Sequence, residues 1–304
     1  AAALGIVKCH FSSIMPVKCL FINEVEMPEL PEVETIKTAI QNSVAKANIT
    51  KVTINNNNLR IKIPDDFVRQ VVGARIQGYR RRAKYIIIDL NNGKSIILHL
   101  GMSGKIKISD RLPEPVKHDH VVIETDNGVI VYNDSRRFGL LTCCDSDKLA
   151  GHKLFAHIGV EPWDEILTGE YLYKKFHNKK IPGKMALLDQ SIMVGIGNIY
   201  ASESLYLARI DPQREAGALS ESECGVLVAK IRQVLEQAIS AGGSTLKDYQ
   251  KPDGSLGYFQ NRHCVYNKTG QRCPDCTCDI EKSGGIRKIV QGGRSTFYCP
   301  VKQK

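Results

Sequence analysis

The first regular pattern along the chain is helical. Apolar residues recur every three to four positions after residue 30, at Val33, Ile36, Ile40 and Val44. This spacing predicts an α-helix with one buried face. Pro31 suits its first turn, and Glu32 and Glu34 suit the positive end of its dipole. We therefore expect the folded part of the chain to open with a helix.

From Ile49 to about Cys144 the pattern changes to short runs rich in β-branched residues, among them 85–88, 95–98 and 129–132. Turn signals separate these runs, as at 91–93 (NNG) and 126–128 (DNG). Many short strands joined by tight turns predict an antiparallel β-sandwich.

Helical signals return from about residue 160. Thr168 can cap one helix, and another is expected to begin near Gly197 and Asn198. Ser220 and Glu223 form a capping box ahead of an apolar-periodic stretch that ends at 242–243 (GG). The tail from residue 264 is strand-like and glycine-rich.

These patterns predict an α+β protein. We expect an extension at 1–26 that is not part of the mature fold, then an N-terminal antiparallel β-sandwich with flanking helices at 27–150. A helical part follows at 151–260 and a strand-like tail at 264–304, and the family resemblance given below implies that they form a second lobe with a finger-like β-hairpin. Residues 1–26 show no clear period and suit a targeting segment, an expression remnant or translated upstream sequence.

The charge balance indicates the kind of partner. Lysine and arginine number 42 against 32 acidic residues, a formal net charge of +10. Such an excess favours a polyanion, with nucleic acid first and an anionic membrane surface second. No uncharged apolar run approaches the roughly 20 residues that span a bilayer. We expect no membrane partner and a monomeric chain.

Cysteines gather at the end of the chain. Five of the ten lie in the last 41 residues: Cys264, Cys273, Cys276, Cys278 and Cys299. A disulfide scaffold is usually short and evenly rich in cysteine, whereas a clustered C-x-x-C pair indicates a metal site in a reducing compartment.

Chemistry is also possible at Pro28 and Glu29. A proline at a free N-terminus is a secondary amine, and an α-amino group has a pKa of roughly 8, so part of it is uncharged at neutral pH. It could attack a sugar carbon and form an iminium ion, while Glu29 moves protons. From these residues alone, a plain helix start is the commoner explanation.

A resemblance reverses that preference. The motifs are PELPEVET at 28–35, RRAKY at 81–85, HLGMSG at 99–104, KHDH at 117–120, DSRRFG at 134–139, VGIGNIYASE at 194–203, GGSTLKD at 242–248 and GRSTFYC at 293–299. In this order they resemble the formamidopyrimidine-DNA glycosylases. Leu30 favours that branch over the endonuclease VIII branch.

The resemblance implies four catalytic roles. Pro28 would be the Schiff-base nucleophile and Glu29 its acid/base partner. Lys84 would donate a proton in β-elimination, and Arg294, on the finger hairpin, would act in δ-elimination. Without the resemblance, Lys84 would be a solvated lysine at the end of a basic turn.

The resemblance also implies DNA contacts, at His118, Arg136, Lys179 and Asn198. Backbone amides around Asn198, freed by Gly195 and Gly197 at a helix start, suit a phosphate clamp; a simple N-cap is the alternative for Asn198. This region resembles a helix–two-turn–helix element.

Met102, Arg136 and Phe138 resemble the trio that fills the gap left by an extruded nucleotide. Met102 and Phe138 could otherwise be core residues. The stretch 242–258 corresponds to a loop that closes on the extruded purine.

The finger departs from the family pattern. Relatives hold one zinc ion with two C-x-x-C pairs, which implies Cys273, Cys276 and Cys299 as ligands here. Lys302 stands in the fourth position, and lysine cannot replace a thiolate in a tetrahedral site. Cys278, Cys264 and His263 are candidate substitutes. Whether Zn²⁺ is bound stays open, and no organic cofactor is expected.

The implied function is a bifunctional DNA glycosylase and AP lyase of base excision repair. It would remove oxidised purines (8-oxoguanine and formamidopyrimidines) from damaged double-stranded DNA and cleave the strand by β,δ-elimination. The active chain would begin at Pro28, in a bacterial cytoplasm near the nucleoid, or in an organelle if 1–26 is a transit segment. The alternatives are a catalytically silent DNA-binding relative and an endonuclease VIII-type enzyme acting on oxidised pyrimidines.

Overall fold

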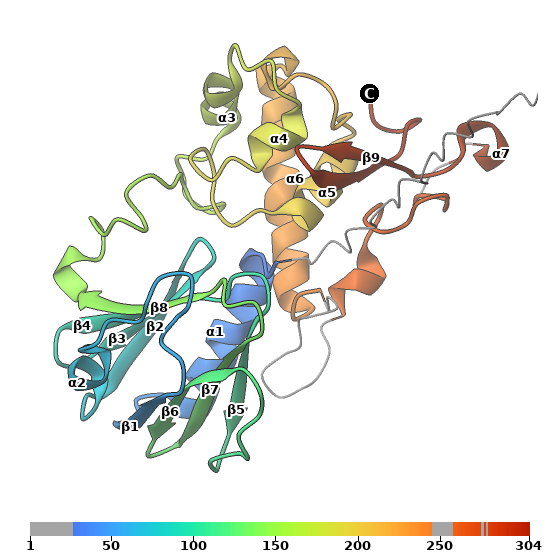
Figure 1. Ribbon diagram of the computed structural model, residues 1–304. Coiled ribbons are helices and arrows are strands. Elements are labelled where there is room, and N and C mark those ends of the chain that lie inside the picture. The colour runs from blue at the N-terminus through green and yellow to red at the C-terminus, as the bar shows by residue number, and fades with distance from the viewer. Residues whose placement is uncertain (1–26, 245–257, 275–276, 278) are drawn as a thin grey trace, which may run out of the picture.

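The computed structural model describes residues 27–244, 258–274, 277 and 279–304. Within these ranges the chain forms two lobes, as Figure 1 shows, with the strands of the first half at the lower left and the helices above them. The predicted two-lobed α+β architecture is confirmed. The division at residues 150, 260 and 264 stays a prediction.

The N-terminal lobe contains two antiparallel sheets of four strands each. One has the order β1-β6-β7-β5 and the other β2-β3-β4-β8. Their bounds are β1 Ile49–Ile54, β2 Ile76–Arg82, β3 Tyr85–Leu90, β4 Lys94–His99, β5 Gly104–Ser109, β6 Asp119–Thr125, β7 Gly128–Asp134 and β8 Leu140–Asp145. The three strand runs named from the sequence lie in β3, β4 and β7, because β-branched side chains suit the interior of a pleated sheet.

Two helices accompany these sheets, α1 (Leu30–Val44) and the short α2 (Phe67–Val71). The predicted stripe of α1 is buried: Val33, Ile36, Ile40 and Val44 are each at most 1% exposed. The helix contacts β2 and β3 of one sheet, β5 and β7 of the other, and α6 of the second lobe. Its N-terminus therefore lies where the two lobes meet.

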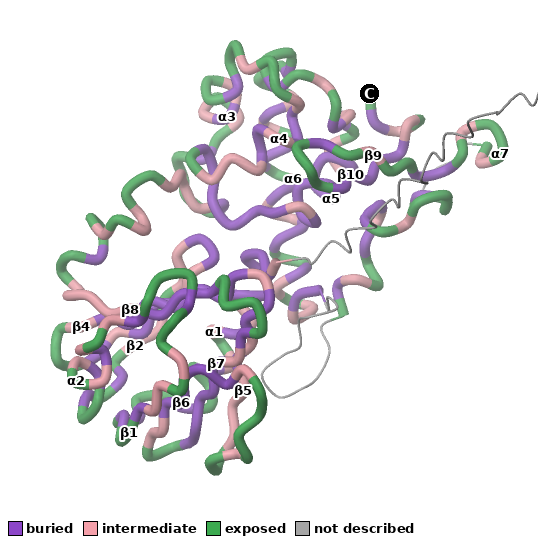
Figure 2. The backbone as a smooth tube through the Cα atoms, in the orientation of Figure 1, coloured by how far each residue is buried: buried purple, intermediate pink, exposed green. Residues whose placement is uncertain are grey.

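The second lobe is built from α3 (Gly169–Phe176), α4 (Gly183–Leu187), α5 (Asn198–Leu207) and α6 (Glu221–Ser240). Thr168 caps α3 by accepting the Tyr171 N–H, and Ser220 and Glu223 form the predicted capping box of α6. Helix α5 is buried along most of its length, as Figure 2 shows. Among the described residues, no helix is both long and apolar enough to cross a membrane.

The tail was predicted to be strand-like from residue 264, and this is wrong for its first part. Strands begin only at β9 (Arg287–Gln291), which pairs with β10 (Arg294–Tyr298), after the short helix α7 (Ile280–Ser283). At residues 264–266 three consecutive backbone N–H groups donate to the buried carboxylate of Glu203 on α5, at 2.7 to 3.0 Å. A side chain thus satisfies donors that a strand would have paired with a neighbouring strand.

Candidate active site

The carboxylate of Glu29 joins the starts of two helices. Glu29 is 3% exposed and immediately precedes α1. Its oxygens accept the backbone N–H groups of Gly197 at 2.7 Å and Ile199 at 2.9 Å, at the start of α5. A Cβ on Gly197 would lie 2.4 Å from Glu29 Cδ, so glycine is needed for this approach. Unpaired amides and the helix dipole favour an anion here, and Glu29 supplies it.

A second carboxylate supports the first. Glu32 is fully buried and accepts the Glu29 N–H at 2.9 Å, the Tyr200 hydroxyl at 2.5 Å and the Ser244 N–H at 2.8 Å. Burial, together with the charge of Glu29, raises the pKa of Glu32 to about 7. Burial also raises the pKa of Glu29, while the charge of Lys84 acts in the opposite direction. This role of Glu32 could not be predicted from the sequence, because Glu in a first helical turn is ordinarily a dipole partner.

Lys84 lies in the turn between β2 and β3, close enough to the Glu29 carboxylate for their charges to interact. It is only 8% exposed, so the alternative of a solvated lysine is wrong. Burial lowers the pKa of Lys84, the charge of Glu29 raises it, and the charge of Arg294 lowers it. Glu29, Lys84 and Arg294 thus lie close enough for their charges to interact, although they come from different parts of the chain.

Arg294 is the first residue of β10 and follows the turn at Gly292 and Gly293. Its side chain is exposed. A hairpin of β9 and β10 therefore carries this arginine, whose charge acts on Lys84 of the other lobe. Pro28 itself is buried, next to Glu29.

His99 is a further polar residue of this region that received no role from the sequence. Its ring lies 4.7 Å, centroid to centroid, from that of Tyr85, which follows Lys84. Burial and the charges of Lys84 and Arg60 lower the pKa of His99 to about 4. Its Nδ1 accepts the Gly101 N–H at 3.0 Å, which leaves the proton of the neutral ring on Nε2. The sequence could not show this, because Lys84 and Arg60 come near His99 only in the folded chain.

The predicted gap-filling residues lie on two loops in contact. Met102 follows β4, and Arg136 and Phe138 follow β7. A Cβ on Gly101 would lie 2.4 Å from the Phe138 carbonyl carbon, so the loops touch at this point. Phe138 is 44% exposed and stacks under the Arg136 guanidinium at 4.8 Å. Phe138 is therefore not a core residue, and its insertion into DNA stays a prediction.

The buried carboxylate of Asp134 fixes both loops. It accepts the Ser103 hydroxyl at 2.5 Å, the Tyr132 hydroxyl at 3.0 Å and the Gly139 N–H at 2.8 Å. Because Ser103 belongs to one loop and Gly139 to the other, Asp134 sets their relative position.

Asn198 makes different contacts from those expected. It is the first residue of α5, and Gly197 is the N-cap, so the N-cap alternative is wrong by one residue. Its Oδ1 accepts Lys184 Nζ at 2.6 Å, and its Nδ2 donates to the Tyr266 hydroxyl at 3.0 Å. The backbone N–H groups of Gly197 and Ile199 bind Glu29, so they are not a vacant phosphate clamp. A DNA contact by Asn198 stays a prediction.

His118 and Lys179 are the remaining predicted DNA contacts. His118 precedes β6 with a left-handed backbone (φ 73°) and is half-buried. Lys179 follows α3 and is also half-buried. They lie on different lobes, and their roles stay predictions.

Two of the three predicted zinc ligands lie in the described part of the finger. Cys273 and Cys299 are buried, while Cys276 and Cys278 lie outside the described residues. In the ranges that the structure describes, no three His, Cys, Asp or Glu side chains are grouped so as to hold a metal ion. Residues 245–257, most of the loop predicted to close on the extruded purine, also lie outside the described residues.

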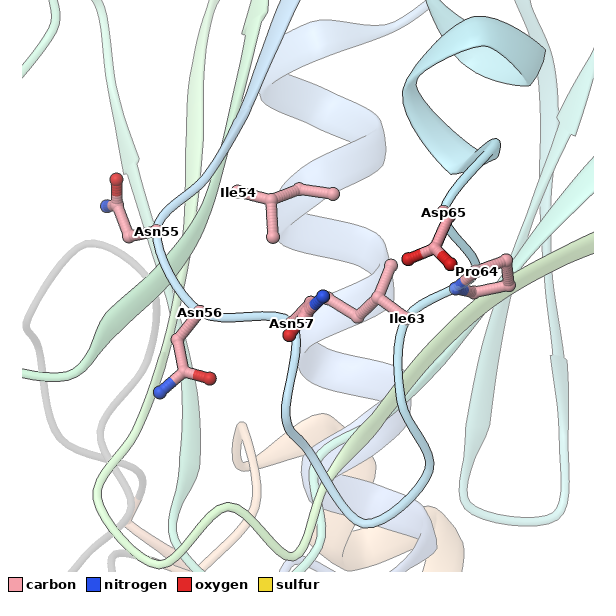
Figure 3. Close-up of a pocket in the computed structure, with 7 residues that line it drawn as sticks. All are labelled: Ile54, Asn55, Asn56, Asn57, Ile63, Pro64 and Asp65. Atoms are coloured by element: carbon pink, nitrogen blue, oxygen red, sulfur yellow. The ribbon is translucent and has the colours of Figure 1, made fainter.

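A surface pocket of about 430 Å³ opens elsewhere, on the segment between β1 and α2 (Figure 3). It is lined by Ile54, Asn55, Asn56, Asn57, Ile63, Pro64 and Asp65. None of these is a predicted site residue. Two of its polar groups are already bonded within the protein, since Asn57 O accepts the Ile63 N–H and Asn55 Nδ2 donates to Asp119 O of β6.

Comparisons with known proteins place this arrangement in a family. A model of the formamidopyrimidine-DNA glycosylase N-terminal domain matches residues 27–141, and one of the H2TH domain of the same enzymes matches 158–250. The formamidopyrimidine-DNA glycosylase of Rhodospirillum rubrum is 42% identical over 281 residues, covering 91% of this chain and 100% of the relative. That of Rickettsia africae is 44% identical over 278 residues, covering 91% and 99%.

Solved structures agree with these matches. Lactococcus lactis Fpg in complex with DNA containing an abasic site superposes with a TM-score of 0.83 at 33% identity, covering 91% of this chain and 99% of that one. The wild-type enzyme with DNA containing N7-benzyl-Fapy-dG gives 0.82 at 33% identity, covering 91% and 100%. Two family models, full-length relatives and one shared fold therefore agree that this chain belongs to the formamidopyrimidine-DNA glycosylase family.

Proposed function

We propose that this protein is a DNA glycosylase and AP lyase of base excision repair that removes oxidised purines from double-stranded DNA. Family membership supports the activity, and related Fpg structures contain Fapy-dG or abasic-site DNA. The observation that carries the proposal is that Lys84 lies close enough to Glu29 and Arg294 for their charges to interact, while Glu29 directly follows the buried Pro28.

Base removal would begin with Pro28. With its nitrogen free, the secondary amine attacks C1′ of the damaged nucleotide and the glycosidic bond breaks, so that the base leaves with a proton. The amine then loses its own proton, the C1′–O4′ bond of the sugar opens with protonation of O4′, and an iminium ion forms. Glu29 is placed to move protons during this exchange, because burial raises its pKa and the amides of α5 hold it in one orientation. The buried setting strengthens each of these electrostatic effects.

Strand cleavage would follow from the same intermediate. The iminium ion acidifies C2′–H, so loss of that proton expels the 3′ phosphate, and a second elimination expels the 5′ phosphate. Lys84 has a lowered pKa and can give up a proton more readily than an exposed lysine. Arg294 stays protonated and would stabilise phosphate charge rather than donate a proton.

The remaining predicted residues would hold the DNA. His118, Arg136, Lys179 and Asn198 would contact the backbone, and Met102 and Phe138 would fill the space left by the extruded base. The net charge of +10 supports a polyanionic partner, and affinity should fall steeply with salt. A monomer in a bacterial cytoplasm remains the expected setting.

The nucleophile requires a free nitrogen, so we propose that the active form begins at Pro28, after initiation at Met27 and removal of that methionine. Chains beginning at Ala1 and at Pro28 should be compared on a duplex with one oxidised guanine, in the presence of borohydride. We expect a covalent adduct at Pro28 only for the shorter chain. Equal trapping of both, without trimming of the longer chain, would contradict the mechanism.

Oxidised pyrimidines are a second candidate substrate. A Lactococcus lactis Fpg structure contains DNA with an oxidised pyrimidine, at a TM-score of 0.82 and 32% identity to this chain. Faster single-turnover incision of an oxidised pyrimidine than of 8-oxoguanine would favour it. A chain trimmed to Pro28 that binds DNA but forms no adduct would instead identify a silent relative.

A further inference from the structure

Lys302 stands where the family's zinc pattern places its fourth cysteine, three residues after Cys299. A protonated ammonium has three N–H donors and no lone pair, so it cannot bind a cation. Thiolates and imidazoles are the donors of closed zinc sites. If the Lys302 side chain instead bonds to other parts of the protein, those bonds could hold the finger together without a metal.

The ammonium of Lys302 lies in a closed set of contacts. Nζ is 3.1 Å from the Tyr206 hydroxyl and 3.2 Å from the Pro274 carbonyl oxygen. The Tyr206 hydroxyl in turn donates to the same carbonyl at 2.6 Å. Nζ also lies 4.9 Å from the centre of the Tyr206 ring, within the range of a cation–π interaction. The Tyr206 hydroxyl also has a side-chain hydrogen bond with Cys273.

These contacts connect the parts that a metal would connect. Pro274 directly follows Cys273 in the first half of the finger, and Lys302 follows Cys299 in the second half. Tyr206 belongs to α5 and is 1% exposed. The ammonium therefore ties both halves of the finger to the helical lobe with protein groups alone.

The residues after Lys302 continue the attachment. Gln303 is 2% exposed, accepts the Cys299 N–H at 2.8 Å and donates to Ile210 O at 2.8 Å. The Lys304 N–H donates to Arg209 O at 3.1 Å. The end of the chain is thus bonded to the segment that follows α5.

Apolar packing holds the hairpin itself. The Phe297 ring of β10 lies 4.8 Å from that of Tyr266, in an edge-to-face arrangement, and Phe297 is 3% exposed. Tyr266 also accepts the Asn198 amide, which links the packing to the start of α5. A small finger usually needs a metal because it lacks such a core, and this one shares the core of the larger lobe.

The donor set in the described part of the finger does not fit a zinc ion. The fourth position is a lysine whose ammonium is already bonded within the protein, and no three His, Cys, Asp or Glu side chains, Cys264 and His263 included, are grouped there to hold a metal. We propose that the finger of this protein is metal-free and that Lys302 replaces the zinc, its ammonium tying the two halves of the finger to Tyr206 of α5. The predicted ligands Cys273 and Cys299 would then be packing residues. This inference concerns how the finger is held and stands apart from the lesion chemistry.

The zinc content of the purified full-length protein tests the proposal directly. Elemental analysis of wild type, expressed with added zinc, should find fewer than about one zinc in ten chains, and a chelator should not change its melting temperature. Lys302→Cys, which restores the family pattern, should gain up to about one zinc per chain. Stoichiometric zinc in wild type, whose removal lowers the melting temperature, would overturn the proposal.

A charge variant provides a second, independent readout. Lys302→Met keeps most of the stem and removes the charge, whereas Lys282→Met changes a lysine whose side chain is 87% exposed on α7. We expect Lys302→Met to lower the melting temperature and to weaken undamaged-duplex binding about tenfold at constant salt, and Lys282→Met to leave the melting temperature unchanged. Wild-type values for Lys302→Met would contradict the role of the ammonium. Neither readout requires base removal, so failure here is distinguishable from failure of the proposed function.

Discussion

The ammonium of Lys184 lies 2.6 Å from Oδ1 of Asn198, inside the protein and not on its surface. The same ammonium is 2.8 Å from Ser295 O and from Thr296 Oγ1, both on β10. Lys184 is fully buried, and a buried ammonium is stable only when it is hydrogen-bonded. It therefore joins the start of α5 to the strand that begins with Arg294.

Replacing Lys184 by methionine should separate these two elements. Asn198 Oδ1 and Ser295 O would lose a buried donor, and each such group costs about 1–3 kcal/mol. We expect a lower unfolding free energy in urea and slower DNA nicking. Lys174→Met, at an exposed position of α3, serves as the matched control and should change stability by less than about 0.5 kcal/mol. Equal stability of the two variants would refute this role of Lys184.

Lys84 should matter most in strand cleavage. In Lys84→Met, we expect single-turnover nicking to fall by about 10²–10⁴-fold, the usual contribution of a positioned proton donor. The charge of Lys84 lowers the pKa of Glu29, so its loss should shift the acidic limb of the pH–rate profile to higher pH. Lys51→Met, at an exposed strand position, is the control. An unshifted profile would argue against contact between the two charges.

Glu32 should make stability depend on pH in a particular direction. Its pKa is about 7 in the folded chain and near 4.5 in the unfolded chain, so the folded state holds more protons between these values. The contribution of Glu32 to the unfolding free energy therefore decreases as pH rises from about 4.5 to 7, by up to about 3 kcal/mol. Urea titrations of wild type and Glu32→Gln should differ in slope over this window. Parallel curves would show that Glu32 is not the titrating group.

Phe138 should affect DNA and not the fold. Because its side chain is 44% exposed, Phe138→Ala should change the unfolding free energy by less than about 0.5 kcal/mol. We expect weaker binding to a duplex with an abasic site and a smaller change for undamaged duplex, since only the former requires a gap to be filled. A loss of equal size for both duplexes would point to a general contact.

Much of the fold follows from local patterns. The stripe of α1, the β-branched runs in β3, β4 and β7, and the capping box of α6 each depend on residues that are neighbours in sequence. The tail was harder to predict, because the backbone at 264–266 pairs with Glu203, about sixty residues away.

The residues of the candidate site also differ in how far the sequence could predict them. Motifs indicated Pro28, Glu29, Lys84 and Arg294, because each lies in a recognisable run. Glu32 and His99 also lie in such runs, but the runs do not indicate their chemistry. Like that of Lys184, it comes from burial and from partners distant in the chain.

The sequence by itself determined the elements, the excess of positive charge and the motifs that imply a DNA glycosylase. Only the tertiary structure decided that backbone amides at the start of α5 bind the Glu29 carboxylate. It also decided that the ammonium of Lys302, in the position of a zinc ligand in the family, bonds to the Tyr206 hydroxyl. The physical reason is that periodicity and capping depend on neighbours in the chain. Desolvation and charge pairing depend on what folding brings together from elsewhere.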